Sequence, residues 1–288
     1  QARELLWNQK VIESNQFESY FRVNSLFFDP NIYGRFLMVV MIGLAAVLLW
    51  ARSGRAVAVS GGLLALLWGG LVLTFSQSSF AALLVGLASL AALRWSFRRV
   101  AAGIGLCAAV ALVVAFGLGI GSDEIDESSG NRLDLIGGGL SMVADRPLHG
   151  FGSGSFGELY REREEASSQR AASASHTIPI TVSAEQGAIG LIAYLVLVVV
   201  SLRLLFAGLG PLSGRDPPAR LVTRAFLAAA YAALLFHTLL YAAFLEDPIA
   251  WTLLAIGIVL LRPVAESGAA TSSSSASSAR TRTATSTP

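Results

Sequence analysis

The residues of this chain that could do chemistry are concentrated in one polar segment, Gly121 to Gln186, which lies between two apolar runs. It holds eleven carboxylates, five arginines and two of the three histidines. Arginine presents paired N–H groups that match phosphate oxygens, and histidine can act as a base near neutral pH. Arg132 and His176 are therefore the segment's candidates for anion binding and for proton transfer.

The two apolar runs on either side, Val100 to Ile120 and Gly187 to Leu202, position this segment. A bilayer's hydrocarbon core needs about 20 apolar residues to cross, so both runs qualify and the polar segment must lie at a membrane surface. Charged residues make up 14% of the chain and the mean hydropathy is +0.61. Soluble domains are roughly a quarter charged. The chain is therefore an integral membrane protein, and its net charge of +2 gives no indication of nucleic-acid binding.

Apolar segments along the chain predict an all-α fold, a polytopic membrane helical bundle. Seven spans are expected, at 34–51, 57–75, 77–93, 100–120, 187–206, 225–244 and 247–262. The expected organisation is a segment 1–33 containing a short amphipathic helix, four spans in 34–120, a large helical loop 121–186, three spans in 187–262, and a disordered tail 263–288.

Arginines in the short loops predict the orientation of the bundle. They occur in alternate connections, at Arg52 and Arg55, at Arg94, Arg98 and Arg99, and at Arg215, Arg220 and Arg224. Such loops stay cytoplasmic, so the loop 121–186, with a formal charge of −6, is expected outside. The segment 1–33, in which Leu5, Leu6, Trp7 and Val11 share a helical face, is expected outside too. An odd number of upstream helices would place it there.

Within the loop, Ser128, Ser129 or Asn131 can cap a helix that Pro147 ends. Arg132 stands at the start of this helix. Gly150, Gly152 and Gly154 follow and predict a turn; a turn that brings backbone amides to a ligand is the alternative. The charged stretch 156–170 is interpreted as a solvated helix.

Each histidine has a structural alternative. His176 is either a base or a surface residue, and His149 is expected to be solvent-exposed. His237, inside a span, is expected to bond Tyr231, Tyr241 or a hydroxyl of a neighbouring helix. For Arg132, the alternative to phosphate binding is pairing with the acidic loop.

The order of four stretches resembles the O-antigen ligase and polymerase superfamily of bacterial membrane glycosyltransferases. The stretches are RVNSLFFDPNIYGRFL from Arg22, TFSQSSFAALLVGL from Thr74, NRLDLIGGGLSMVADRPLHGFGSGSF from Asn131 and HTIPITVSAEQGAIGLIAYL from His176. The resemblance runs from Arg22 to Leu195. It implies a GT-C-like bundle in the cytoplasmic (inner) membrane with its active face outside. The chain would then be the C-terminal part of a longer protein.

The resemblance implies inverting, metal-independent transfer of a glycan from undecaprenyl diphosphate to a saccharide or other acceptor, without a cofactor. On this basis the expected site has His176 as the catalytic residue, Arg22, Arg132 and Arg35 as diphosphate ligands, and Asn31, Gln77, Ser79 and Glu185 as supporting residues. Two positions depart from the family pattern. Gln77-Ser78-Ser79 stands where Ser-Arg is common, and Thr177 follows His176 where Asn is common.

Three other functions are weighed. A chain polymerase shares the donor chemistry, and the sequence leaves it open. A transporter or flippase of lipid-linked saccharides needs polar groups at the membrane midplane, where these spans carry few. A scaffold without chemistry would leave the arginines and His176 without a shared task.

Overall fold

The computed structural model describes residues 16–17, 20–27, 29–101, 135–164, 177–212, 217–241 and 245–261, and these are helical apart from one small hairpin. The hairpin pairs β1 (Gln16–Phe17) with β2 (Tyr20–Phe21) in antiparallel register. The helices are α3 (Pro30–Trp50), α4 (Gly54–Thr74), α5 (Gln77–Arg94), a helix Leu135–Asp145 that we call the loop helix, α8 (Phe156–Glu164), α9 (Ile178–Phe206), α10 (Ala219–Thr238) and α11 (Pro248–Val259).

Five of the described helices, α3, α4, α5, α9 and α10, are long and apolar enough to cross a membrane, so this is a multi-pass membrane protein. The expected helical bundle is thereby confirmed, but seven spans are not. The fourth predicted span, 100–120, lies beyond residue 101, outside the described residues. The seventh corresponds to α11, whose 12 residues cover about 18 Å at 1.5 Å per residue, short of a hydrocarbon core about 30 Å thick.

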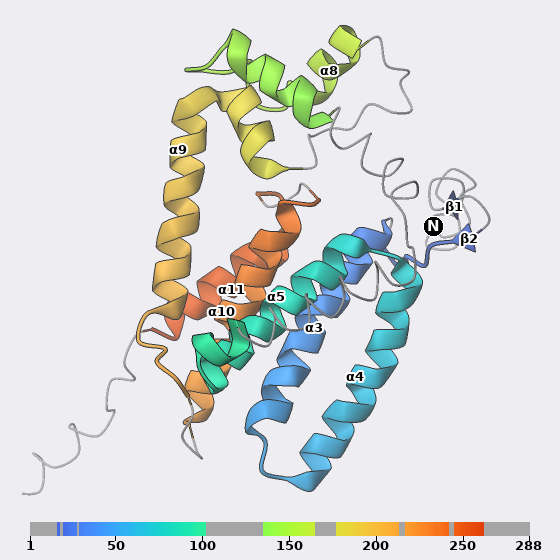
Figure 1. Cartoon of the computed structure of the whole chain (residues 1–288), viewed down its shortest axis with the longest axis vertical. Helices are drawn as coiled ribbons and strands as arrows, with labels where there is room; N and C mark the ends of the chain where they lie inside the picture. The colour runs from blue at the N-terminus through green and yellow to red at the C-terminus, as the bar shows by residue number, and fades with distance from the viewer. Residues whose placement is uncertain are drawn as a thin grey trace, which may run out of the picture.

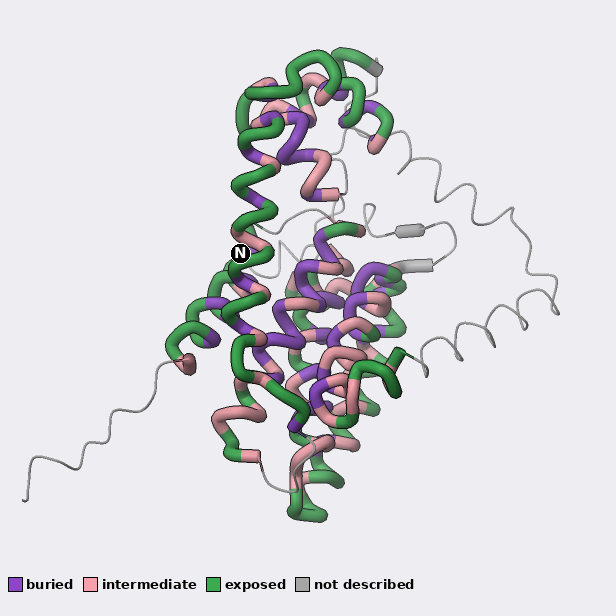
Figure 2. Tube along the Cα trace, turned by 60° about the vertical axis from the view of Figure 1, so that its left-hand side comes forward, coloured by how far each residue is buried: buried purple, intermediate pink, exposed green. Residues whose placement is uncertain are grey.

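The centre of the bundle is α10, which packs against α3, α5, α9 and α11 (Figure 1). Its alanine-rich buried face allows neighbouring helices to approach closely, as small residues do in membranes. Gly86 of α5 lies against Ile42 of α3 and Ala233 of α10, where a Cβ atom would overlap the isoleucine side chain. By contrast, α4 packs mainly on α3 and leaves most of its side chains exposed (Figure 2).

One end of the bundle, which we call the loop end, is where α3, α5 and α11 begin and α4 and α10 end. The loop helix and α8 lie at the same end of the molecule, above it in Figure 1. They share a small core with the first part of α9, composed of Leu135, Met142, Phe156, Tyr160 and Ala184. The loop helix, the turn after it, α8 and the part of α9 before Gly187 together form what we call the loop module. Because α9 bends at Gly187 (φ 66°, ψ −162°), its later residues belong to the bundle.

Candidate active site

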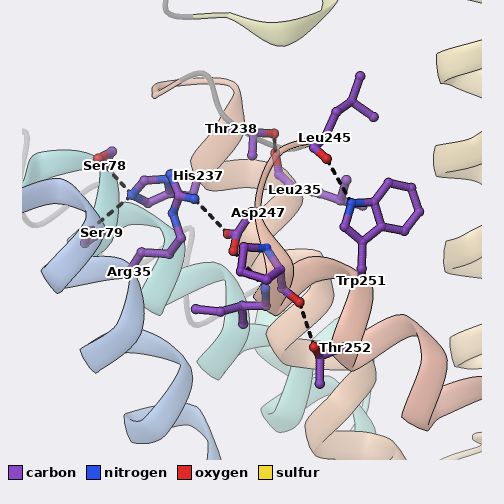
Figure 3. Close-up of polar contacts among 12 residues, drawn as sticks. Arg35, Ser78, Ser79, Leu235, His237, Thr238, Leu245, Asp247, Trp251 and Thr252 are labelled. Carbon is purple, nitrogen blue, oxygen red and sulfur yellow. Dashed lines mark hydrogen bonds and ion pairs between the residues drawn. The ribbon is translucent and has the colours of Figure 1, made fainter. Parts of the chain in front are cut away.

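Polar side chains gather at the loop end because that is where helices begin with polar caps. Asp29, Ser76 and Asp247 cap α3, α5 and α11, each accepting a hydrogen bond from a backbone N–H of the first turn. Around these caps lies what we call the polar cluster, part of which Figure 3 shows. It comprises Arg22, Asp29, Asn31, Arg35, Ser76, Ser78, Ser79, His237, Tyr241 and Asp247.

Arg22 precedes α3 and reaches across to the end of α4. Its Nε donates to the carbonyl of Thr74 at 2.8 Å, and its Nη2 donates to Asn31 Oδ1 at 3.1 Å and to the carbonyl of Phe75 at 3.5 Å. The last carbonyls of a helix lack partners within it, so α4 offers ready acceptors here. Nη1 donates to no acceptor among the described residues. Arg22 is thus held by one side of its guanidinium, and the other side has no partner in the part of the chain that the structure describes.

A chain of hydrogen bonds leads from Asn31 into the bundle. Asn31 Oδ1 also accepts from Ser76 Oγ at 2.8 Å, and Ser76 Oγ lies 2.8 Å from Ser79 Oγ. The Oγ atoms of Ser78 and Ser79 each lie 3.2 Å from His237 Nε2 (Figure 3). This confirms the expected bond between His237 and a hydroxyl of a neighbouring helix.

Arg35 and Asp247 form a buried ion pair between α3 and the start of α11. Nη1 of Arg35 lies 2.7 Å from Asp247 Oδ2, and the arginine is only 4% exposed. Nε and Nη2 of Arg35 have no hydrogen-bond partner among the described residues. The phosphate role expected for Arg35 remains a prediction. A phosphate would have to enter the mouth of the bundle to reach these nitrogens.

Tyr241 closes the cluster on the side of α10. Its hydroxyl donates to Asp29 Oδ2 at 2.8 Å, and the Arg35 guanidinium lies 5.6 Å from the centre of its ring. Burial raises the pKa of the Tyr241 phenol, and the neighbouring Asp29 carboxylate raises it further. The phenol therefore stays protonated and keeps donating to Asp29. This hydrogen bond connects Tyr241, shortly after the end of α10, to the residue that caps α3.

Away from the polar cluster, two glycine-rich stretches contact each other: the turn with Gly150, Gly152 and Gly154, and the bend of α9 with Gly187 and Gly190. Gly150 lies in a turn, and the two residues after it form hydrogen bonds with α9. Phe151 N donates to the carbonyl of Ala184 at 3.1 Å, and Gly152 N donates to the carbonyl of Glu185 at 2.7 Å. A Cβ atom on Gly150 would overlap the backbone of residues 185–186, and one on Gly187 would overlap that of residues 148–149. Both glycines have φ near +66°. The expected turn is confirmed, and its backbone amides bind α9.

Glu185 holds this junction together. Its Oε1 accepts from Phe156 N at 3.2 Å, at the first residue of α8, while its carbonyl accepts from Gly152 N. A carboxylate at a helix start is favourable because the first N–H groups are free and the helix dipole is positive there. In the described residues Glu185 therefore supports the loop module, at a distance in the fold from the polar cluster.

The exposed histidine His149 lies in the same module, as expected from the sequence. It lines a shallow pocket of about 420 Å³ with Asp145, Arg146, Pro147, Leu148 and Gly150. The Arg146 guanidinium lies 4.6 Å from the centre of the Phe151 ring, and Arg163 forms an ion pair with Asp145.

The structure brings four of the expected site residues together in the polar cluster: Arg22, Asn31, Arg35 and Ser79. Gln77 is exposed on the first turn of α5, beside the cluster. His176 and Arg132 lie outside the described residues, as does the amphipathic helix expected around Leu5 to Val11. His176 directly precedes Thr177, the cap of α9, whose hydroxyl donates to the carbonyl of Leu239 at 3.0 Å just beyond the end of α10. Thr177 itself therefore lies at the loop end.

Sequence reasoning missed the partners that organise the cluster: Asp29, Ser76, Ser78, Tyr241 and Asp247. A signal for one of them was present, since an arginine within a span, as Arg35 is, needs an acidic partner. Glu246-Asp247 was the only acidic pair near a later span. Among the described residues, no group of three or more His, Cys, Asp or Glu side chains could hold a metal ion.

Comparison with known proteins gives one match and one absence. Residues 62–195, from α4 through the loop module to α9, match the family model described as O-antigen ligase. The matched region includes Ser76, Ser79 and both glycine-rich stretches. No curated protein matches the chain.

Proposed function

Because residues 62–195 match the O-antigen ligase family, we propose that this membrane protein transfers a glycan from an undecaprenyl-diphosphate carrier to an acceptor at the outer face of the cytoplasmic membrane. The observation that carries the proposal is the geometry of Arg22. Its guanidinium is fixed by Thr74 and Asn31 at the loop end, and its Nη1, which contacts no acceptor among residues that the structure describes, would bind a phosphate.

In the proposed reaction, the bond between the anomeric carbon and the diphosphate oxygen breaks while the acceptor oxygen attacks from the opposite face. Configuration inverts, undecaprenyl diphosphate leaves, and the acceptor proton passes to His176. Arg22 and Arg132 neutralise the charge that grows on the diphosphate oxygens. Arg35 supplies a third cation, and its Nε and Nη2 bind a phosphate oxygen that reaches the mouth of the bundle.

Protein groups alone perform every step of this scheme. Arg22 precedes α3, Arg132 precedes the loop helix, and His176 precedes α9, so each functional side chain belongs to the residues leading into a helix. Within the loop module, the loop helix and the start of α9 are connected, because the turn at Gly150 contacts α9. Group transfer requires its catalytic groups to be held in fixed positions, and this junction fixes the described residues of the loop helix relative to the start of α9.

Two alternatives remain to be distinguished. A chain polymerase would use the same donor site with a lipid-linked acceptor. A transporter of lipid-linked saccharides would place its polar groups near the midplane, whereas Arg22, Arg35 and Asp247 lie at the loop end.

The test uses the full-length protein in lipid nanodiscs with a lipid-linked glycan donor and candidate acceptors. Arg22→Ala is expected to weaken binding of undecaprenyl diphosphate and to reduce transfer. Arg22→Lys should recover little, because a point charge cannot keep the bonds to Thr74 and Asn31 while binding phosphate. Wild-type donor binding by Arg22→Ala would contradict the proposed site. Movement of the donor across the bilayer without transfer would favour the transporter.

A further inference from the structure

The hydrogen bonds from Arg22 to His237 have a direction that the donors and acceptors determine. An arginine can only donate, so the Asn31 atom that faces Arg22 Nη2 must be the amide oxygen. Ser76 Oγ, 2.8 Å from that same oxygen, must therefore use its single proton to donate to it. The hydroxyl of Ser76 has no proton left for any other partner.

The next two links follow from the same count. Ser79 Oγ lies 2.8 Å from Ser76 Oγ, so the proton between them belongs to Ser79. Ser78 Oγ lies 3.2 Å from both Ser76 Oγ and His237 Nε2 and provides a second link between them. With its proton committed, Ser79 Oγ can only accept from His237 Nε2, which lies 3.2 Å away. His237 therefore carries its proton on Nε2. Its Nδ1 is then a bare acceptor, which agrees with its having no partner among the described residues.

We infer that His237 is a positioning residue for Arg22, acting through Ser79, Ser76 and Asn31. The inference rests on the proposed function, in which Arg22 binds the donor diphosphate. His237, Ser79 and Ser76 are fully buried, so the links among these three residues are shielded from water. Each hydroxyl donates toward Asn31, and this polarises the amide oxygen that holds Arg22.

A histidine suits this place because its ring is rigid and spans the gap between α10 and α5. Its proton on Nε2 sets the rotamer of Ser79, which sets Ser76 and so the amide of Asn31. Without that proton, Ser79 can turn its own hydroxyl to other acceptors, and the amide of Asn31 is free to flip. A flipped amide would present N–H groups to Arg22 and repel its guanidinium from the position that leaves Nη1 open.

The experiment compares His237→Phe, His237→Gln and the double variant Ser78→Ala with Ser79→Ala in the full-length protein in nanodiscs, with undecaprenyl diphosphate as the binding probe. Phenylalanine fills the ring space without a donor, whereas the glutamine amide can donate from a position close to Nε2. Ser89→Ala is the matched control, because Ser89 also lies on α5 but bonds only to the carbonyl of Val85.

His237→Phe is expected to weaken probe binding and to raise the KM for donor about tenfold, the effect of about 1.4 kcal/mol, with kcat nearly unchanged. The double variant Ser78→Ala with Ser79→Ala should give the same loss, because it removes both links between His237 and Ser76. Combining it with His237→Phe should cause no further loss, and His237→Gln should recover most of the affinity. Wild-type affinity in both His237→Phe and the serine double variant, or losses that add when the two are combined, would overturn the inference. Loss of binding in Arg22→Ala alongside that result would leave the proposed function intact.

Discussion

Arg35 and Asp247 are 212 positions apart in sequence, yet their side chains form a buried ion pair 2.7 Å long at the loop end. Asp247 has a second role, since its Oδ1 accepts from Ile249 N at 2.9 Å and so caps α11. One carboxylate thus neutralises a buried cation of α3 and starts the last described helix. The position of α11 in the bundle depends on both roles.

The first prediction separates these roles of Asp247. Asp247→Asn keeps a good helix cap but removes the charge, which leaves the Arg35 guanidinium buried without an anion. Breaking a buried pair in this way typically costs about 3–5 kcal/mol, so we expect a loss of this size in the free energy of unfolding in detergent micelles. Asp247→Ala should lose about 1 kcal/mol more, because the cap is lost as well.

The control for this prediction is the double variant Arg35→Met with Asp247→Asn. Removing both charges leaves no uncompensated ion, so the double variant should be more stable than Asp247→Asn alone. Equal stability of Asp247→Asn and the wild type would show that the buried pair does not form.

A second prediction concerns the contact between the loop turn and the bend of α9. Gly150→Ala and Gly187→Ala each introduce a Cβ atom where φ is about +66° and where the opposite backbone occupies the space. The left-handed conformation alone costs roughly 1–2 kcal/mol for a residue with a side chain, and the overlap adds to it. Both variants should have a melting temperature well below that of the wild type in thermal unfolding.

Gly154→Ala is the matched control for this contact. Gly154 also has a positive φ, 82°, but nothing lies within 4 Å of its Cβ position. It should lose only the conformational cost. If Gly150→Ala were no less stable than Gly154→Ala, the close approach of the turn to residues 185–186 would be wrong.

A third prediction tests which face of the membrane the loop end occupies. In a background with Cys107→Ala, a cysteine at exposed Ser153 in the loop module should react with an impermeant thiol reagent added to intact cells. A cysteine at exposed Ser53, between α3 and α4, should react only after the cells are opened. Labelling of Ser53→Cys in intact cells would reverse the orientation predicted from the arginines.

The positions of the membrane-spanning helices were predictable from the sequence, whereas the exact residues at which helices begin and end were only partly predictable. Apolar runs place α3, α4 and α5 within a few residues of their observed bounds, because lipid requires long uninterrupted apolar helices. The span predicted at 187–206 begins at Gly187, where the helical backbone of α9 is interrupted, and the apolar run does not reveal the helical segment that precedes it from Ile178. Apolar runs also overestimate α11, because composition cannot show where a helix stops.

The candidate site was also only partly predictable from the sequence. Arginines just before a span or within its first turns are visible in sequence, so Arg22 and Arg35 could be identified. Their partners come from elements far along the chain, as Asp247 does for Arg35, and only packing brings them together. The supporting role expected for Glu185 stays a prediction; in the described structure its Oε1 accepts from the first N–H of α8, and its carbonyl accepts from Gly152 N.

The last prediction concerns His176, which precedes the cap of α9 at the loop end. As the general base of the proposed transfer, it would take the proton of the acceptor while Arg22 and Arg132 hold the diphosphate. Neutralised phosphate favours the imidazolium less than a bare dianion does, so these arginines help keep the base in its neutral form. His176→Ala is expected to lower kcat by roughly 10²–10⁴, the usual contribution of a general base.

Donor binding distinguishes this role from phosphate binding. If His176 is a base, His176→Ala should bind undecaprenyl diphosphate in nanodiscs as tightly as the wild type does. Collapsed donor binding with surviving turnover at saturating donor would make His176 a phosphate ligand instead. His149→Ala is the matched control, because His149 is an exposed histidine of the same loop module and should leave both kcat and donor binding unchanged. Unchanged transfer in His176→Ala would contradict the role of this histidine in catalysis.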